Sequence, residues 1–428
     1  MSAPSPKNVL AGLLRAAGHP DATAGAIELP GTAPALPSSF AVDAAAQATI
    51  AAAALAANEL WRLRTGRRQG VSVDMRSAAI EFRSERYLRI DGKPPSEYHD
   101  PIAGLYRCGD GRWVRLHTNL PHHRDGVLAL LGCSHDRAAV QRALDQWRGE
   151  ALETAAADAG LVVTACRSFA EWDAHPQGRA IARLPPFTID QIGDAPARPM
   201  GAADRPLAGV KVLDLTRTIA GPVCGRTLAA HGADVLLITA SHLPSMQPLV
   251  IDTGRGKLST SIDLRRSSGR ETLAALLRGA DVFVQGYRPG AIAAFGFGPP
   301  RRRHDRNAAA LGPADGSTRH ACARVAVVGR FTSVDPAAFD PRADIGPRWP
   351  ALSALMAIAG GYGGGCRESS RESPGKSEPG CKPVIRLVAS LPRAAAIADG
   401  GPVSSESRYW GPQGRRWFPH RFCCARTR

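Results

Sequence analysis

This 428-residue chain has no long apolar runs, and this excludes the simplest membrane-spanning or exported design. No window approaches the ~20 apolar residues that a transmembrane helix needs. The short apolar stretch Val9–Ala17 contains Arg15, which does not fit a secretory signal. We therefore expect a cytoplasmic protein without a membrane partner, whose nine cysteines stay reduced.

Several familiar catalytic and metal-binding patterns are also missing. The sequence contains neither a dinucleotide-binding glycine fingerprint nor a G-x-S-x-G elbow. Cysteines near the C-terminus lack the paired spacing of structural zinc sites: Cys366, Cys381, Cys423 and Cys424. His117, His122 and His123 with Asp125 could ligate a metal, but a hydrated loop is the favoured interpretation. We expect no metal and no permanently bound cofactor.

Acidic residues balance most of the basic ones except in the last third of the chain, where most of the basic excess lies. Residues 1–300 hold 33 Lys+Arg and 28 Asp+Glu, whereas residues 301–428 hold 21 and 10. The last third also holds five of the nine cysteines and little apolar periodicity, so we predict a largely irregular tail. Its composition is typical of GC-rich coding sequence read in a shifted frame, and we hypothesise such a C-terminus. Because aromatic residues are not interleaved with its basic ones, nucleic-acid binding is the least favoured function.

Three buried strands define the middle of the chain: Val210–Leu215, Val235–Ile238 and Val282–Val284. Helical patterns separate them, one ending at His231 and one at Gly269–Arg278. Apolar strands alternating with helices predict an α/β fold with an open parallel sheet, here a Rossmann-like unit. Ligands of such sheets bind at the carboxyl ends of the strands.

The N-terminal half predicts an α+β module. Helices are expected at Asn8–Ala17 and Phe40–Arg64, a hairpin at Gly104–His117, and a capping box at Ser168 with Glu171. The Pro- and Gly-rich stretch after residue 192 is typical of a linker. The expected organisation is a leader (1–37), the α+β module (38–192), a linker (193–206), the α/β domain (207–299) and the basic tail (300–428).

Three turns of the α/β domain could bind an anion, and each has an ordinary alternative. Thr216–Pro222 either presents helix N–H groups or is a plain strand-to-helix turn. Asp252–Lys257, with two glycines, either approaches a phosphate or is a solvated basic turn. Gln285–Gly290 either offers Tyr287 and Arg288 to a nucleotide or leaves that arginine exposed. If all three bind, they should face one crevice.

Ordered matches along this domain resemble the opening part of CoA-transferase family III, the group that includes carnitine CoA-transferase. They are Pro206–Leu215, Ala220–Pro222, Leu228–Val235, Arg255–Lys257, Ile262–Leu264, Ala280–Val284 and Tyr287–Gly290. Ala44–Met75, Gly104–Val114 and Glu171–Gln177 resemble later parts of the same family. The late-type module therefore precedes the opening-type one, which suggests a tandem or permuted member.

The resemblance implies that coenzyme A or acyl-CoA binds as substrate, with CoA passing between an acyl-CoA and a carboxylic acid. It places six residues in the CoA site: Ile219, Ala220, Arg255, Lys257, Tyr287 and Arg288. It also implies a homodimer and a catalytic aspartate in a Gly-aromatic-Asp context. The sequence offers only Asp340, preceded by Phe339 but not by glycine. We therefore expect CoA binding with weak or absent turnover, and a catalytically inactive CoA-binding paralogue is the alternative.

Overall fold

The structure is a computed structural model. It describes residues 5–18, 27–38, 41–96, 99–182, 187, 189–191, 201–287 and 291–298, and the strands 325–329 and 385–389. Arg288, Asp340 and most of the basic tail lie outside the described residues.

The first part of the chain is helical around one long helix. Its elements are α1 (Pro6–Ala16), β1 (Ile27–Glu28), α2 (Val42–Thr65), β2 (Val71–Ser72), α3 (Met75–Phe82) and α4 (Ser84–Tyr87). Gly66 ends α2 with a φ of 73°, a left-handed conformation that glycine adopts without a side-chain clash. Alanines line much of α2, so neighbouring helices can approach it closely.

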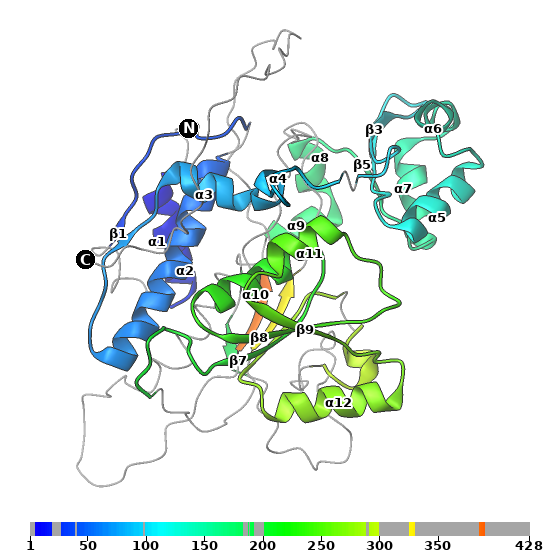
Figure 1. Ribbon diagram of the computed structural model, residues 1–428. Coiled ribbons are helices and arrows are strands. Elements are labelled where there is room, and N and C mark those ends of the chain that lie inside the picture. The colour runs from blue at the N-terminus through cyan, green and yellow to red at the C-terminus, as the bar shows by residue number, and fades with distance from the viewer. Residues whose placement is uncertain are drawn as a thin grey trace.

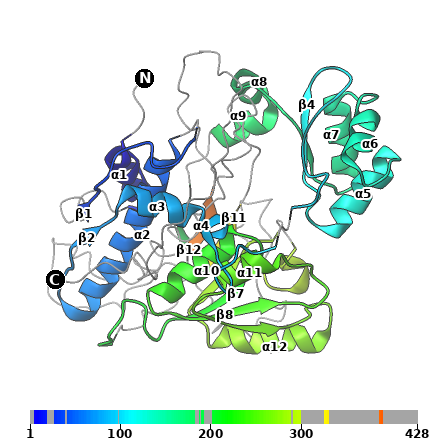
Figure 2. The same cartoon turned by 45° about the horizontal axis from the view of Figure 1, so that its top comes forward.

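A hairpin module follows, and it has its own hydrophobic core. Its elements are β3 (Gly104–Arg107), β4 (Trp113–Leu116), α5 (Pro121–Leu131), α6 (Arg137–Leu144), α7 (Gly149–Asp158) and β5 (Val163–Ala165). The predicted hairpin and the capping box at Ser168 are confirmed. Figures 1 and 2 show β3 to α7 set apart from the larger body, with α8 (Phe169–Ala174) and α9 (Pro176–Ala182) between them.

The α/β part builds a seven-stranded sheet in the order β6-β12-β11-β10-β7-β8-β9. Its elements in chain order are β6 (Asp190–Gln191), β7 (Lys211–Leu215), α10 (Ala220–Ala230), β8 (Asp234–Thr239), α11 (Gln247–Thr253), β9 (Lys257–Ser261), α12 (Ser267–Arg278), β10 (Val282–Gln285), the 3₁₀ turn η2 (Ala293–Phe295), β11 (Val325–Gly329) and β12 (Ile385–Ala389). All neighbouring strands are parallel except β12 and β6. The predicted parallel α/β sheet is confirmed.

Helices cover both faces of this sheet, as buried strands require. Figure 1 shows α10 and α11 on one side and α12 on the other. Alternate residues of β7 face opposite ways: Val212 packs with α10, whereas Leu213 packs with Leu273 of α12. This alternation gives each face its own apolar layer.

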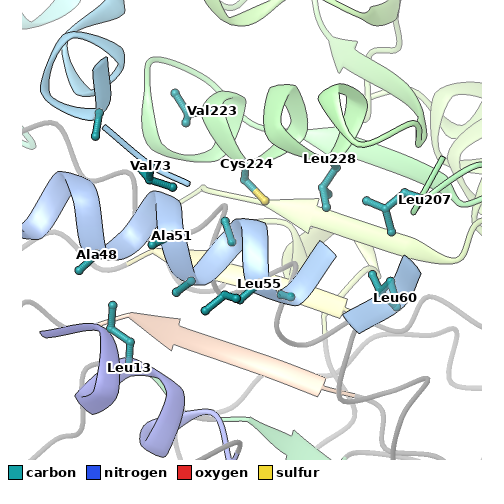
Figure 3. Close-up of a cluster of buried hydrophobic side chains, with 14 of the residues drawn as sticks. Leu13, Ala48, Ala51, Leu55, Leu60, Val73, Leu207, Val223, Cys224 and Leu228 are labelled. Atoms are coloured by element: carbon teal, nitrogen blue, oxygen red, sulfur yellow. The ribbon is translucent and has the colours of Figure 1, made fainter. Parts of the chain in front are cut away.

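The N-terminal helices and the α/β part share one hydrophobic core. Figure 3 shows α2 lying between α10, which contributes Cys224 and Leu228, and α1, which contributes Leu13. Leu55 and Leu228 are each at most 1% exposed within this cluster. The two parts are therefore packed as one body, although the segment 99–200 separates them in the sequence.

Two features of the sheet were not predicted. Strand β9 lies at the sheet edge, and its residues from Leu258 to Ser261 are exposed, so the sequence there has no buried run. Strands β11 and β12 come from the segment after residue 300, where we expected no continuation of the α/β pattern, yet they extend the sheet in parallel. The remainder of that segment lies outside the described residues, and the frameshift hypothesis stays untested.

The fold should lose stability in mild acid through His231, which ends α10. Burial, and then the charge of Arg205, lower the pKa of His231 from 6.5 to about 4. A histidine with a depressed native pKa stabilises the fold fully above the unfolded-state pKa, and this contribution is lost as the pH falls from about 6.5 towards 4. The loss should approach about 3 kcal/mol.

Urea unfolding at pH 7.5 and pH 5 should therefore show a steeper acid loss for the unaltered protein than for His231→Gln. His122→Gln, which alters a surface histidine, serves as the control and should keep the original pH dependence. Equal acid loss in all three proteins would contradict this assignment.

Candidate functional site

The loop after β7 begins the candidate site. It carries Thr216 to Ile219, and α10 starts directly afterwards at Ala220. Ile219 occupies the N-cap position and makes no side-chain cap hydrogen bond. The first N–H groups of α10 are thus left without a side-chain cap at the carboxyl edge of the sheet. Helix N-termini of this kind attract phosphate and carboxylate groups.

A buried ion pair lies beneath this helix start. Lys257 Nζ is 2.7 Å from Asp214 Oδ2 and donates to the carbonyl oxygen of Pro222, also at 2.7 Å. The two charged side chains are 1% and 0% exposed. Thr216 donates its hydroxyl to the other carboxylate oxygen of Asp214. The pair therefore connects β7, β9 and the first turn of α10.

Two further side chains gather at the same carboxyl edge. Arg217 donates to the carbonyl oxygen of Pro244 and so links the loop after β7 to the loop after β8. Tyr287 follows β10, and its N–H donates to Gln285 Oε1 at 3.1 Å. Burial raises the pKa of Tyr287, while the nearby charge of Arg217 lowers it in part. The loops after β7, β8 and β10 thus form one contiguous rim.

Arg255 belongs to a second polar network. It donates from Nε to the carbonyl oxygen of Asp252 at 3.0 Å and from Nη2 to Asp252 Oδ1 at 3.1 Å. Asp252 Oδ2 accepts from Ser84 Oγ at 2.7 Å and from Arg226 at 3.0 Å. Half of the Arg255 side chain remains exposed, so its guanidinium can still meet a ligand.

The predicted site residues do not all come together. Ile219, Ala220 and Tyr287 lie on the rim at the carboxyl ends of β7 and β10, as expected. Arg255 and Lys257 instead lead into β9, where Lys257 pairs with Val235 near the start of β8. Our expectation that this turn faces the same crevice is therefore wrong in its placement, because the turn precedes its strand instead of following it. Arg288 and Asp340 are outside the described residues.

The sequence also did not reveal how closely α10 packs on the buried pair of Asp214 and Lys257. A Cβ at position 221 would overlap Thr216, and one at position 225 would overlap Asp214 Oδ2 and come within 2.9 Å of Lys257 Nζ. The sequence does contain two glycines four residues apart, Gly221 and Gly225, which leave one face of the helix without side chains at two positions.

His122 and His123, which the sequence also offered as candidates, lie within a helix. The two histidines belong to α5 and not to a loop, because Pro121 starts the helix there. Within the described ranges, no group of three or more His, Cys, Asp or Glu side chains is placed to hold a metal ion. Cys224 is fully buried in α10, and burial raises the pKa of its thiol, as expected for a small residue packed in the core.

A hollow of about 740 Å³ lies in the hairpin module. Its charged lining includes Arg112, Arg148 and Arg167. Arg112 already pairs with Glu171 at 2.8 Å, and Arg167 pairs with Glu153. Its cations are thus largely neutralised, and the hollow makes a poor anion site. None of the described helices has the length and apolarity to cross a bilayer.

Comparison with known proteins assigns the family. The sequence model of CoA-transferase family III matches residues 8–192 and 207–307. An acyl-CoA transferase of Gibberella moniliformis is 34% identical over 214 residues, covering 46% of this chain and 37% of that protein. The acetyl-coenzyme A transferase nodX of Hypoxylon pulicicidum is 45% identical over 105 residues, covering 24% of this chain and 17% of that protein.

A crystal structure of the protein Rv3272 from Mycobacterium tuberculosis shares 31% identity over 23% of this chain and 30% of that one, with a TM-score of 0.22. The chain thus spans well under half the length of the curated relatives that it matches. The family model, in contrast, matches well over half of this chain in two separate segments. The chain belongs to CoA-transferase family III.

Proposed function

We propose that the rim at the carboxyl ends of β7 and β10 binds coenzyme A and acyl-CoA, and that the chain transfers CoA between an acyl-CoA and a carboxylic acid. Coenzyme A acts here as substrate and not as a resident cofactor. The observation that carries the proposal is the start of α10, which has no side-chain cap and lies on the same rim as Tyr287. Backbone N–H groups at such a start hold phosphate or thioester oxygens.

The names of the relatives support the substrate class. They include an acyl-CoA transferase, an acetyl-coenzyme A transferase and a formyl-CoA:oxalate CoA-transferase of Escherichia coli. The donor is accordingly proposed to be an acyl-CoA thioester and the acceptor a small carboxylate. Because no Gly-aromatic-Asp motif accompanies the CoA-binding part, we propose weak turnover. Asp340 is the aspartate of the tail that we propose for this residual activity.

The organisation of the chain is part of the same proposal. A late-type module (38–192) precedes a CoA-binding domain (207–299), joined by the linker 193–206 and followed by the basic tail. Arg288, the residue after Tyr287 in the sequence, is proposed as a further CoA-binding residue. The active form is proposed to be a cytoplasmic homodimer, as the family resemblance implies.

Titration of the full-length protein with CoA, acetyl-CoA and ATP tests the binding step. We expect saturable binding of both CoA ligands and at least tenfold weaker binding of ATP, because ATP lacks the pantetheine arm that reaches the rim. Incubation with formyl-CoA and oxalate, followed by mass spectrometry, then tests transfer to form oxalyl-CoA.

The same incubation distinguishes the two forms of the proposal. A new thioester would show transfer. If the incubation is repeated with a panel of acyl-CoA donors and the protein binds them but forms no new thioester, the inactive paralogue is favoured. A folded protein that binds neither CoA nor acetyl-CoA would refute the proposal.

A further inference from the structure

We propose that Lys257 is a positioning residue for the loop 216–221, and that it does not contact the phosphates of the ligand. This inference rests on the proposed function for its effect on ligand affinity. Its geometric part concerns the ligand-free protein and stands by itself.

The ammonium group of Lys257 has no surface to offer a phosphate. Its side chain is 1% exposed, and two of its three N–H donors are used at 2.7 Å by Asp214 and by the Pro222 carbonyl. A phosphate could reach it only by displacing α10 from the sheet. The cation is also neutralised by Asp214, so it adds little attraction for an anion outside.

The carboxylate of Asp214 accepts a second hydrogen bond, in addition to the one from Lys257. Its Oδ1 accepts from the hydroxyl of Thr216, the first residue after β7, while its Oδ2 holds Lys257. One buried carboxylate thus fixes the beginning of the loop, and Lys257 fixes its end through Pro222. Both ends of the segment that carries Ile219 and Ala220 are tied to the same pair.

The loop between these two ties needs such support. Thr218 has a φ of 73°, a left-handed conformation that β-branched residues rarely adopt. Strained backbone of this kind persists only where the surroundings hold it in place. Gly221 and Gly225 remove the side chains that would separate α10 from Thr216 and from the ion pair. The pair therefore sets the position of the N–H groups proposed to bind the ligand.

Hydrogen exchange on the ligand-free protein tests the positioning directly. Lys257→Met keeps most of the side-chain length but removes the charge. We expect amide exchange in the first hydrogen-bonded turn of α10, residues 223–226, whose amides bond back to residues 219–222, to accelerate at least tenfold in this variant. Lys211→Met makes the same substitution at an exposed lysine on β7 and should leave exchange unchanged.

Ligand affinity provides the second readout. If Lys257 positions the loop, Lys257→Met should weaken CoA binding and also accelerate exchange in the ligand-free protein. If Lys257 instead touched a phosphate, CoA would bind more weakly but exchange in the ligand-free protein would not change; that result would overturn the inference.

A third variant makes a milder change and so distinguishes a loss of positioning from general misfolding. Thr216→Val removes the hydroxyl bond to Asp214 and keeps the ion pair, so it should accelerate exchange in the same segment by a smaller factor. Unchanged exchange in both Lys257→Met and Thr216→Val would overturn the inference. If the wild type binds no CoA, the proposed function fails, but the exchange result still decides the positioning role.

Discussion

Replacing Arg226 with methionine should lower the free energy of unfolding by about 4 kcal/mol, because it leaves a buried carboxylate without its main counter-ion. The side chains of Arg226 and Asp252 are 8% and 3% exposed, and their closest atoms lie 3.0 Å apart. Methionine fills much of the same volume but carries no charge. Removing one partner of a buried pair typically costs about 3–5 kcal/mol, since the other partner stays desolvated.

The effect should extend across the junction between the two parts of the chain. Ser84 of α4 donates to Asp252 and Arg226 donates to Glu81 of α3, so the N-terminal helices and the α/β part meet in this network. Glu81 is half exposed and contributes less. Loss of Arg226 should therefore raise hydrogen exchange in α3 and α4 as well as in α11.

A matched variant separates this buried pair from ordinary surface ion pairs. Arg265 pairs with Asp263 at 2.7 Å, but its side chain is 58% exposed. Arg265→Met should cost at most about 1 kcal/mol in urea unfolding. In the double variant Arg226→Met with Asp252→Leu, part of the lost stability should return, because no buried carboxylate is left with the half-exposed Arg255 as its counter-ion. If Arg226→Met cost no more than Arg265→Met, the network would not hold the two parts together.

The sequence was sufficient for the strands that are buried on both faces. Val282–Val284 is an uninterrupted apolar run, and Val210–Leu215 is apolar except for Lys211 and Asp214, because helices cover both sides of these strands. This left little choice of structure. Strand β9 has no such run, since an edge strand with exposed residues can be polar throughout. Its pairing with β8 follows from the chain reversal through α11, which periodicity does not reveal.

For the site, less could be predicted from the sequence than for the strands. A turn with two glycines, an arginine and a lysine has the composition of a phosphate loop, and the sequence could not tell where its cations point. Lys257 points beneath α10 to a carboxylate 43 positions earlier, and Asp252 meets Ser84 across 168 positions. Such contacts depend on packing between distant segments, whereas motif spacing reports only local geometry.

Replacing Gly225 with alanine should destabilise the protein by about 3 kcal/mol, although the same change normally stabilises a helix. Glycine within a helix is about 1 kcal/mol less favourable than alanine. Here the added Cβ would overlap Asp214 Oδ2 and lie 2.9 Å from Lys257 Nζ. Neither atom can retreat, since both side chains are at most 1% exposed and fixed by hydrogen bonds. The helix must shift, and with it the N–H groups of its first turn.

Gly12 is the matched control, because it lies within α1, is exposed and has open space where a Cβ would be. Gly12→Ala should raise the free energy of unfolding by up to about 1 kcal/mol. Gly225→Ala should cost less when Asp214→Ala and Lys257→Met have emptied the space beneath α10. Stabilisation by both alanines would contradict the close approach of α10 to the ion pair. Opposite signs at the two glycines would instead show that the position of this helix start is set by what lies underneath it.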